Sequence, residues 1–141
     1  MKNINIPSGH PSFELKTLVV ALNQNSGRPF IVFERNMNEL DIIETHETNF
    51  HNSDREGGVN RGSEQHNKEH NEKVFLNYFV QHVRDFDAKE KFDRIILIAP
   101  QEMKNDLHEK LEKHIADKTE IIPGNFYKSE PLEILEKIRK S

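Results

Sequence analysis

Residues Phe92 to Pro100 read FDRIILIAP, and this segment says more than any other about the architecture of the chain. Ile95 to Ile98 are four consecutive aliphatic residues, so both faces of the strand that they form would be apolar. Strands of this kind lie near the centre of parallel sheets that helices cover on both faces. Pro100 closes the segment, because proline cannot donate a hydrogen bond to a neighbouring strand. We therefore expect a central parallel strand in an α/β domain.

Downstream of this strand, the chain alternates between helical and extended patterns. Residues 101–117 carry an apolar residue at every fourth position, which predicts an amphipathic helix: Met103, Leu107, Leu111 and Ile115. Residues 119–122 (TEII) are expected to form a short last strand, which Pro123 and Gly124 end. The last helix begins near Ser129, with Pro131 in its first turn, where the missing N–H costs nothing. This alternation predicts right-handed crossovers between parallel strands.

Upstream, three apolar segments are separated by short polar turns. The segments 18–22 (LVVAL), 28–35 (RPFIVFER) and 39–44 (ELDIIE) read as strands, with a tight turn at 36–38. Their short connections predict an antiparallel meander. A helix is expected over about 68–88, because apolar residues recur there at helical spacing: Val74, Phe75, Tyr78, Phe79, His82, Val83 and Phe86. We expect His82 to lie at the edge of the core.

The predicted order of elements is β-β-β-loop-α-β-α-β-α. A meander followed by right-handed crossovers gives a five-stranded mixed sheet of order 3-2-1-4-5 with helices on its faces. This is the α/β arrangement of ribonuclease H-like folds. Residues 1–16, which include Pro7 and Pro11, are expected to form an N-terminal arm, and residues 17–141 a single domain.

Composition limits the classes to which the chain can belong. Its 141 residues include no cysteine, which excludes disulfides and thiolate catalysis. No apolar run approaches the ~20 residues that a membrane-spanning helix needs. The start, MKNINIPSGHPS, lacks the apolar region of a secretory signal, so we expect a cytoplasmic location. A net charge of −4 favours no general binding to nucleic acid and no reading of DNA sequence, but it leaves a local basic patch open.

A long polar segment, THETNFHNSDREGGVNRGSEQHNKEHNE at residues 45–72, interrupts the domain. Loops of this length are uncommon in compact domains, and we expect a flexible loop at about 46–67. Gly57 and Gly58 lie between Arg55 and Arg61. One interpretation is a tip that enters an RNA-rich site, with the arginines against phosphates. The other is a disordered surface loop.

The same segment contains His66 and His70, which would lie on one face of a helix. Their spacing suits a pair of metal ligands, but the sequence HNKEH lacks the general-base glutamate of the HExxH motif. No acidic residue occurs in the first strand, where ribonuclease H-like catalysis needs one, and no phosphate-binding glycine motif is present. We therefore expect no catalytic residues, no metal and no cofactor. A metal-dependent hydrolase built on the histidine-rich loop remains an alternative.

Residues 125–128 (NFYK) follow the last strand, where open α/β sheets bind ligands at the carboxyl ends of their strands. Lys128 is a candidate for binding phosphate there, and Phe126 or Tyr127 for stacking on a base. The alternative is a loop that its aromatic side chains anchor to the core.

Several of these segments together resemble the host attachment protein family. The FDRIILIAP strand resembles the strand motif of that family. The resemblance extends over about residues 17–140 and includes four further segments: Leu18 to Glu34, Gly57-Gly58, the helix start from Lys68 to Phe75, and TEIIPGNFYKS at 119–129 with Lys128 in the expected turn.

That family is grouped with the middle domain of archaeo-eukaryotic class 1 release factors and of Pelota. The resemblance implies a ribonuclease H-like sheet and a non-enzymatic protein that binds the ribosome or RNA through its Gly-rich loop. An alternative, which the family name suggests, is a protein-interaction factor with an indirect role in attachment to host cells. Release factors carry a Gly-Gly-Gln tip, whereas Gly58 here is followed by Val59. Many family members carry an aspartate after the first strand, where this chain has Asn23.

We expect the purified protein not to release peptide from peptidyl-tRNA on the ribosome. The reason is that Val59 occupies the position that a release factor fills with glutamine. Release of a labelled peptide from programmed ribosomes measures this activity directly. A release rate clearly above spontaneous hydrolysis would contradict the expectation.

Overall fold

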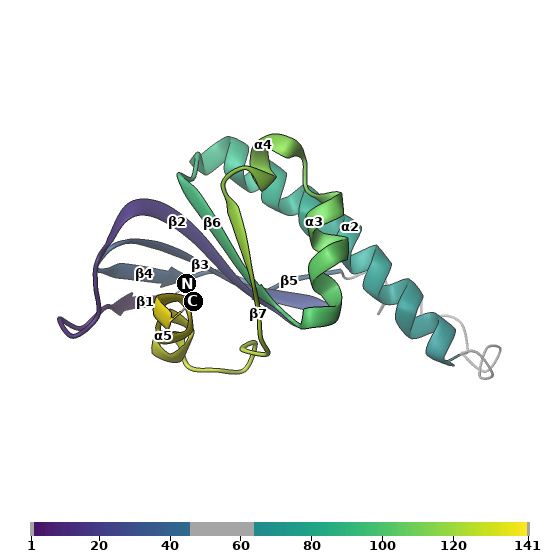
Figure 1. The fold of residues 1–141 in the computed structure, drawn as a ribbon, viewed down its shortest axis with the longest axis horizontal. Coiled ribbons are helices and arrows are strands. Elements are labelled where there is room, and N and C mark those ends of the chain that lie inside the picture. The colour runs from purple at the N-terminus through teal and green to yellow at the C-terminus, as the bar shows by residue number, and fades with distance from the viewer. Residues whose placement is uncertain (1, 46–63, 141) are drawn as a thin grey trace.

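The computed structural model describes residues 2–45 and 64–140, which form a mixed sheet with helices on both faces (Figure 1). Its strands are β1 (Lys2–Asn5), β2 (Phe13–Leu22), β3 (Ser26–Glu34), β4 (Asn36–Glu39), β5 (Ile43–Glu44), β6 (Arg94–Ala99) and β7 (Thr119–Pro123). Its helices are α2 (Glu64–Glu90), the 3-10 turn η2 (Gln101–Met103), α3 (Lys104–Lys110), α4 (Lys113–Ala116) and α5 (Pro131–Lys140).

The centre of the sheet is the parallel pair β2 and β6. Leu18 pairs with Ile95, and Ala21 pairs with Ile98. All residues from Ile95 to Ala99 are buried, as expected for a strand that is covered on both faces. Since β7 pairs with β6 in parallel and β3 pairs with β2 antiparallel, the expected mixed α/β sheet is confirmed.

Successive side chains of β2 and β6 point to opposite faces of the sheet, and this divides the apolar residues between two cores. Leu18, Ile95 and their neighbours on one face meet Phe79 of α2, together with residues of η2, α3 and α4. Val19, Ile96 and their neighbours on the other face meet Ile134 and Leu135 of α5. Figure 1 shows the same layers, with α2, α3 and α4 on one side of the sheet and α5 on the other.

The expected number of five strands is wrong, because the described residues form a sheet of seven. Its path is β1-β4-β3-β2-β6-β7, and β5 pairs with β3. This path differs from the expected order 3-2-1-4-5 in two ways. The segment predicted as one strand at 39–44 is divided between β4 and β5, both of which pair with β3. In addition, β1 extends the sheet beyond β4, through residues that we assigned to the N-terminal arm.

The turn that we predicted at residues 36–38 lies instead at residues 34–35, so it begins two residues earlier. Phe33 pairs with Asn36, so the chain reverses over Glu34, the last residue of β3, and Arg35. Glu34 adopts a φ of 57°, the left-handed conformation that two-residue hairpin turns require. Because the reversal is so short, Met37 becomes a strand residue and is completely buried.

The helix that we predicted over 101–117 is broken at Leu111, whose ψ of 137° is extended. The cause is the spacing of its apolar residues. At 3.6 residues per turn, each step of four residues rotates the side chain by about 40° around the helix, so a straight helix would carry the fourth apolar residue away from the sheet. The break allows both Leu111 and Ile115 to reach the core.

His82 lies at the edge of the core, between two aromatic rings of α2. Its ring centroid is 6.0 Å from that of Tyr78 and 6.1 Å from that of Phe86. Burial lowers the pKa of His82 from its ordinary value, and the nearby Asp85 carboxylate opposes this shift. The imidazole is therefore held toward its neutral form, as suits a residue that packs against apolar neighbours.

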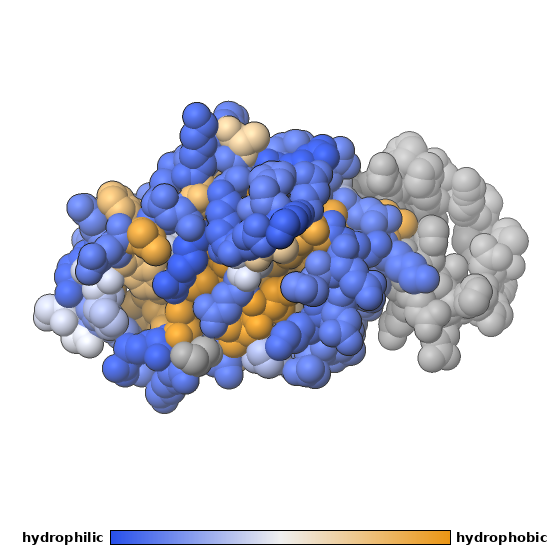
Figure 2. All heavy atoms as spheres, turned by 45° about the horizontal axis from the view of Figure 1, so that its top comes forward, coloured by the Kyte–Doolittle hydropathy of each residue, from blue (hydrophilic) through white to orange (hydrophobic). Residues whose placement is uncertain are grey.

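The surface is mostly polar. Figure 2 shows hydrophilic side chains over most of one face and a band of hydrophobic ones across its middle. Among residues 2–45 and 64–140, no helix is long and apolar enough to cross a membrane.

We expect Phe79→Ala to lower the free energy of unfolding by roughly 3–5 kcal/mol, because a fully buried ring is replaced by a cavity. Denaturant titration measures this change. Tyr78→Ala is the matched control, since Tyr78 is the preceding residue of the same helix and is 43% exposed. Equal losses in the two variants would contradict the observed orientation of α2.

Candidate functional site

A cavity of about 230 Å³ lies at the carboxyl end of β2, beside the loop that follows β7. Its lining consists of Leu22, Asn23, Asn125, Tyr127 and Lys128. In open α/β sheets this edge is where ligands bind, because loops there leave the sheet in different directions. The structure therefore brings together Lys128 and Asn23, which are far apart in the sequence.

Asn23 closes the turn between β2 and β3. Its side-chain oxygen accepts hydrogen bonds from the N–H groups of Asn25 (2.9 Å) and Ser26 (2.7 Å), and from the Ser26 hydroxyl (3.1 Å). An asparagine oxygen commonly closes turns in this way. Asn23 thus shapes one wall of the cavity through its bonds within the turn.

Arg28 holds the opposite wall, the loop from Gly124 to Glu130. Its Nη1 donates to the carbonyl oxygens of Tyr127 (2.6 Å) and Ser129 (2.8 Å). Its Nε donates to Glu39 at 3.2 Å, which fixes the guanidinium against the sheet. Arg28 was not among our predicted site residues, because an arginine at the start of a strand carries no sequence signal that it will bind a distant loop.

The two aromatic residues of this loop have different environments. Phe126 packs against the α5-side core, and a Cβ added at Gly124 would lie only 2.9 Å from its ring. Phe126 is thus an anchor of the loop, and Gly124 makes room for it. Tyr127 is half-buried and lines the cavity.

Lys128 is the cation of this cavity. Its side chain is exposed, and it forms no ion pair among the residues that the structure describes. One ammonium group beside amide side chains and a phenol can bind an anion, since each of these groups donates hydrogen bonds.

The structure describes the side chains of none of the other predicted site residues. Arg55, Gly57, Gly58 and Arg61 fall outside the described residues. His66 and His70 belong to the first turns of α2, where only the backbone is described. Within the described parts of the chain, no three side chains of His, Asp or Glu are grouped so that they could hold a metal ion.

Comparison with known proteins identifies one family. The model of a family described as "protein required for attachment to host cells" matches residues 21–138. No curated protein matches the chain. Among solved structures, the crystal structure of Archaeoglobus fulgidus Pelota is similar, with a TM-score of 0.48 and 12% sequence identity. The similarity covers 89% of this chain and 34% of the Pelota chain, so the chain spans about a third of that protein.

We expect Arg28→Lys to loosen the loop at 124–130, because a single ammonium group cannot replace the planar guanidinium that binds two carbonyl oxygens and Glu39. Amide hydrogen exchange at Gly124 and Ser129 should become faster, and the free energy of unfolding should fall by about 1–3 kcal/mol. Arg35→Lys is the matched control, since Arg35 also donates to two carbonyl oxygens but at a distant turn. Exchange in the 124–130 loop that is unchanged by Arg28→Lys would refute this role.

Proposed function

The chain belongs to the family of proteins required for attachment to host cells, and from this premise we propose that it is a non-enzymatic protein that binds the phosphate backbone of RNA, as the ribosome presents it. The observation that carries the proposal is a shared location. The cavity with Lys128 and the last residue of β5, after which the Gly-rich segment follows in the chain, lie at the same end of the central strands.

The pairing of β5 supports this shared location. Glu44 pairs with Ser26, and Ser26 donates its N–H to Asn23 of the cavity lining. Residue 45 is the last described residue before the Gly-rich segment. The segment that contains Arg55 and Arg61 therefore starts beside the turn that forms one wall of the cavity.

The residues at this edge suit a nucleic-acid backbone. Lys128 supplies a positive charge, and Asn125 is an exposed amide that can donate to phosphate oxygen. The half-buried ring of Tyr127 offers a surface for stacking a base. Arg28 holds the backbone of Tyr127 and Ser129 in place, so little backbone conformational entropy would be lost on binding.

The Gly-rich segment would add the larger part of the binding surface. Gly57 and Gly58 would permit close approach of the backbone to RNA, and Arg55 and Arg61 would bind phosphates. The chain as a whole carries a charge of −4, so such binding must depend on these local groups.

A second candidate function is that of a protein-interaction factor with an indirect role in attachment, which the description of the family favours. Among the described residues, Phe33 and Ile42 are large apolar side chains with exposures of 43% and 49%. Cosedimentation with purified ribosomal subunits distinguishes the two candidates. A protein that binds only protein partners involved in attachment to host cells would stay in the supernatant.

We expect the protein to cosediment with ribosomal subunits and Arg55→Ala with Arg61→Ala to weaken this binding. The slope of log K against log salt concentration should become shallower by about 0.7–0.9 for each phosphate that the variant no longer neutralises. Lys128→Ala should have the same effect with a smaller magnitude, because it removes one charge. The midpoint of thermal unfolding should not change in the Lys128 variant, since the side chain is exposed.

The matched control is Lys89→Ala with Lys113→Ala. These substitutions also remove two exposed charges, but from the far end of α2 and from α4, near the amino end of β7. An equal reduction of binding in the control would show that only total charge matters. Binding that survives deletion of residues 46–63 and Lys128→Ala together would refute the proposal.

A further inference from the structure

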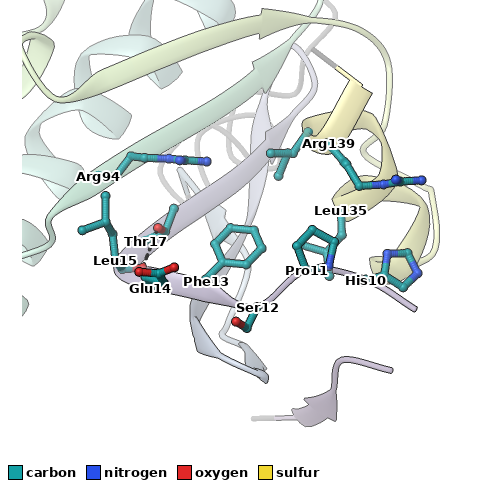
Figure 3. A pocket seen from close by; sticks show the side chains of 11 residues that line it. His10, Pro11, Ser12, Phe13, Glu14, Leu15, Thr17, Arg94, Leu135 and Arg139 are labelled. Carbon is teal, nitrogen blue, oxygen red and sulfur yellow. Dashed lines mark hydrogen bonds between the residues drawn. The ribbon is translucent and has the colours of Figure 1, made fainter. Parts of the chain in front are cut away.

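A second cavity, of about 470 Å³, lies at the opposite end of the central strands, between the amino end of β2 and helix α5 (Figure 3). Its volume falls in the range of about 300–1,000 Å³ that is typical of small-molecule sites. Much of its lining is apolar: Phe13, Leu15, Leu135 and Ile138. The polar group of greatest interest is Arg94, the first residue of β6.

The cavity results from a difference in strand length. β6 begins at Arg94, which pairs with Thr17, so the first residues of β2 extend beyond β6. The register of β2 against β3 also shifts between Phe13 and Thr17. Helix α5 covers this overhang through Leu135 and Ile138 but leaves a space above the sheet.

Arg94 faces this space, on the same face of β6 as Ile96 and Ile98. Its guanidinium carbon lies 5.9 Å from the centroid of the Phe13 ring. Figure 3 shows the side chain extended from β6 across the cavity, above Phe13. The guanidinium therefore packs against the Phe13 ring and the sheet on one side, and its other side faces the cavity.

Arg94 has no anionic partner in the described part of the chain. Its Nε is shielded from solvent and has no hydrogen-bond acceptor, and none of the carboxylates in residues 3–45 and 72–140 forms an ion pair with it. A shielded donor without an acceptor costs about 1–3 kcal/mol, and more when it is charged. An anion in the cavity would remove this cost.

The other charged groups of the lining are differently placed. Arg139 donates to Glu136 within α5, and His10 lies 3.7 Å from the same carboxylate. Glu14 is exposed, and Figure 3 shows it on the side of β2 away from Arg94. Arg94 is thus the lining cation that a ligand could neutralise, while Glu14 at the rim disfavours a ligand with two negative charges.

We propose that this cavity binds a small organic monocarboxylate with an apolar body. The carboxylate would accept hydrogen bonds from the Arg94 guanidinium, whose planar fork matches a carboxylate. The apolar body would lie against Phe13, Leu135 and Ile138, where it removes apolar surface from water. This site is separate from the Lys128 cavity, and it does not depend on the RNA-binding proposal.

Octanoate and octanamide are the probes, because they share a chain and differ in charge. Titration of the isotope-labelled protein by NMR should show octanoate shifting the amide signals of Phe13, Leu15 and Arg94. Octanamide should bind at least about tenfold more weakly, which corresponds to about 1.4 kcal/mol. Octyl phosphate, which carries more charge, should bind no better than octanoate.

Arg94→Gln should remove the preference for octanoate over octanamide and leave octanamide binding unchanged. Arg139→Gln is the matched control and should retain the preference, because Arg139 is exposed and paired with Glu136. Circular dichroism of each variant verifies its fold. If Arg94→Gln fails to fold, Arg94→Lys takes its place; because it keeps the charge, it should retain part of the preference for octanoate. Equal affinities of octanoate and octanamide for the unmodified protein, or shifts at other residues only, would overturn the proposal, as would tighter binding of octyl phosphate.

Discussion

The parallel pairing of β2 with β6 determines where the other elements must lie. These strands join the antiparallel half of the sheet to the parallel half, and each face of the pair forms one of the two cores. A parallel strand that is buried on both faces is stable only when helices cover both faces, because its backbone and side chains are removed from water together. The positions of α2 and α5 on opposite faces follow from this one requirement.

The connection from α2 into β6 is held by a second, polar interaction. Asp87 is buried, and its Oδ1 accepts hydrogen bonds from the Phe92 N–H (3.0 Å) and from Lys118 Nζ (2.8 Å). Lys118 Nζ also donates to the Phe92 carbonyl oxygen at 2.7 Å. Since Lys118 immediately precedes β7, one carboxylate joins the end of α2, the start of β6 and the start of β7. The Asp87 side chain is 10% exposed and the Lys118 side chain 27%, so burial of the carboxylate offsets part of what the ion pair adds to stability.

What could be predicted from sequence follows the strength of local patterns. Ile95 to Ile98 indicate a central strand, because a short run of mainly β-branched residues that Pro100 closes fits a strand covered on both faces. The division of residues 39–44 between two strands could not be predicted, since it depends on the two-residue reversal at 34–35 that buries Met37. The break at Leu111 was missed for a related reason: the spacing of four residues fits one amphipathic helix as a local pattern, but contact of both Leu111 and Ile115 with the core depends on where the sheet lies. Arg28 and Arg94 carried no signal, because the sequence does not reveal that one would bind a distant loop and the other would face a cavity.

The two cavities lie at the two ends of the central strands, and the packing of the sheet explains why. From Leu18 to Leu22 of β2, every side chain is buried in one core or the other. A polar ligand-binding group in that interval would be buried without a hydrogen-bond partner whenever the ligand is absent. The free energy lost in this way would exceed what most ligands supply on binding. Beyond that interval, the side chains meet loops and a helix end, where charged groups such as Lys128 and Arg94 keep part of their surface exposed. The same burial that makes the centre of the sheet predictable from sequence therefore confines chemical recognition to its ends, where residues are fixed by long-range interactions.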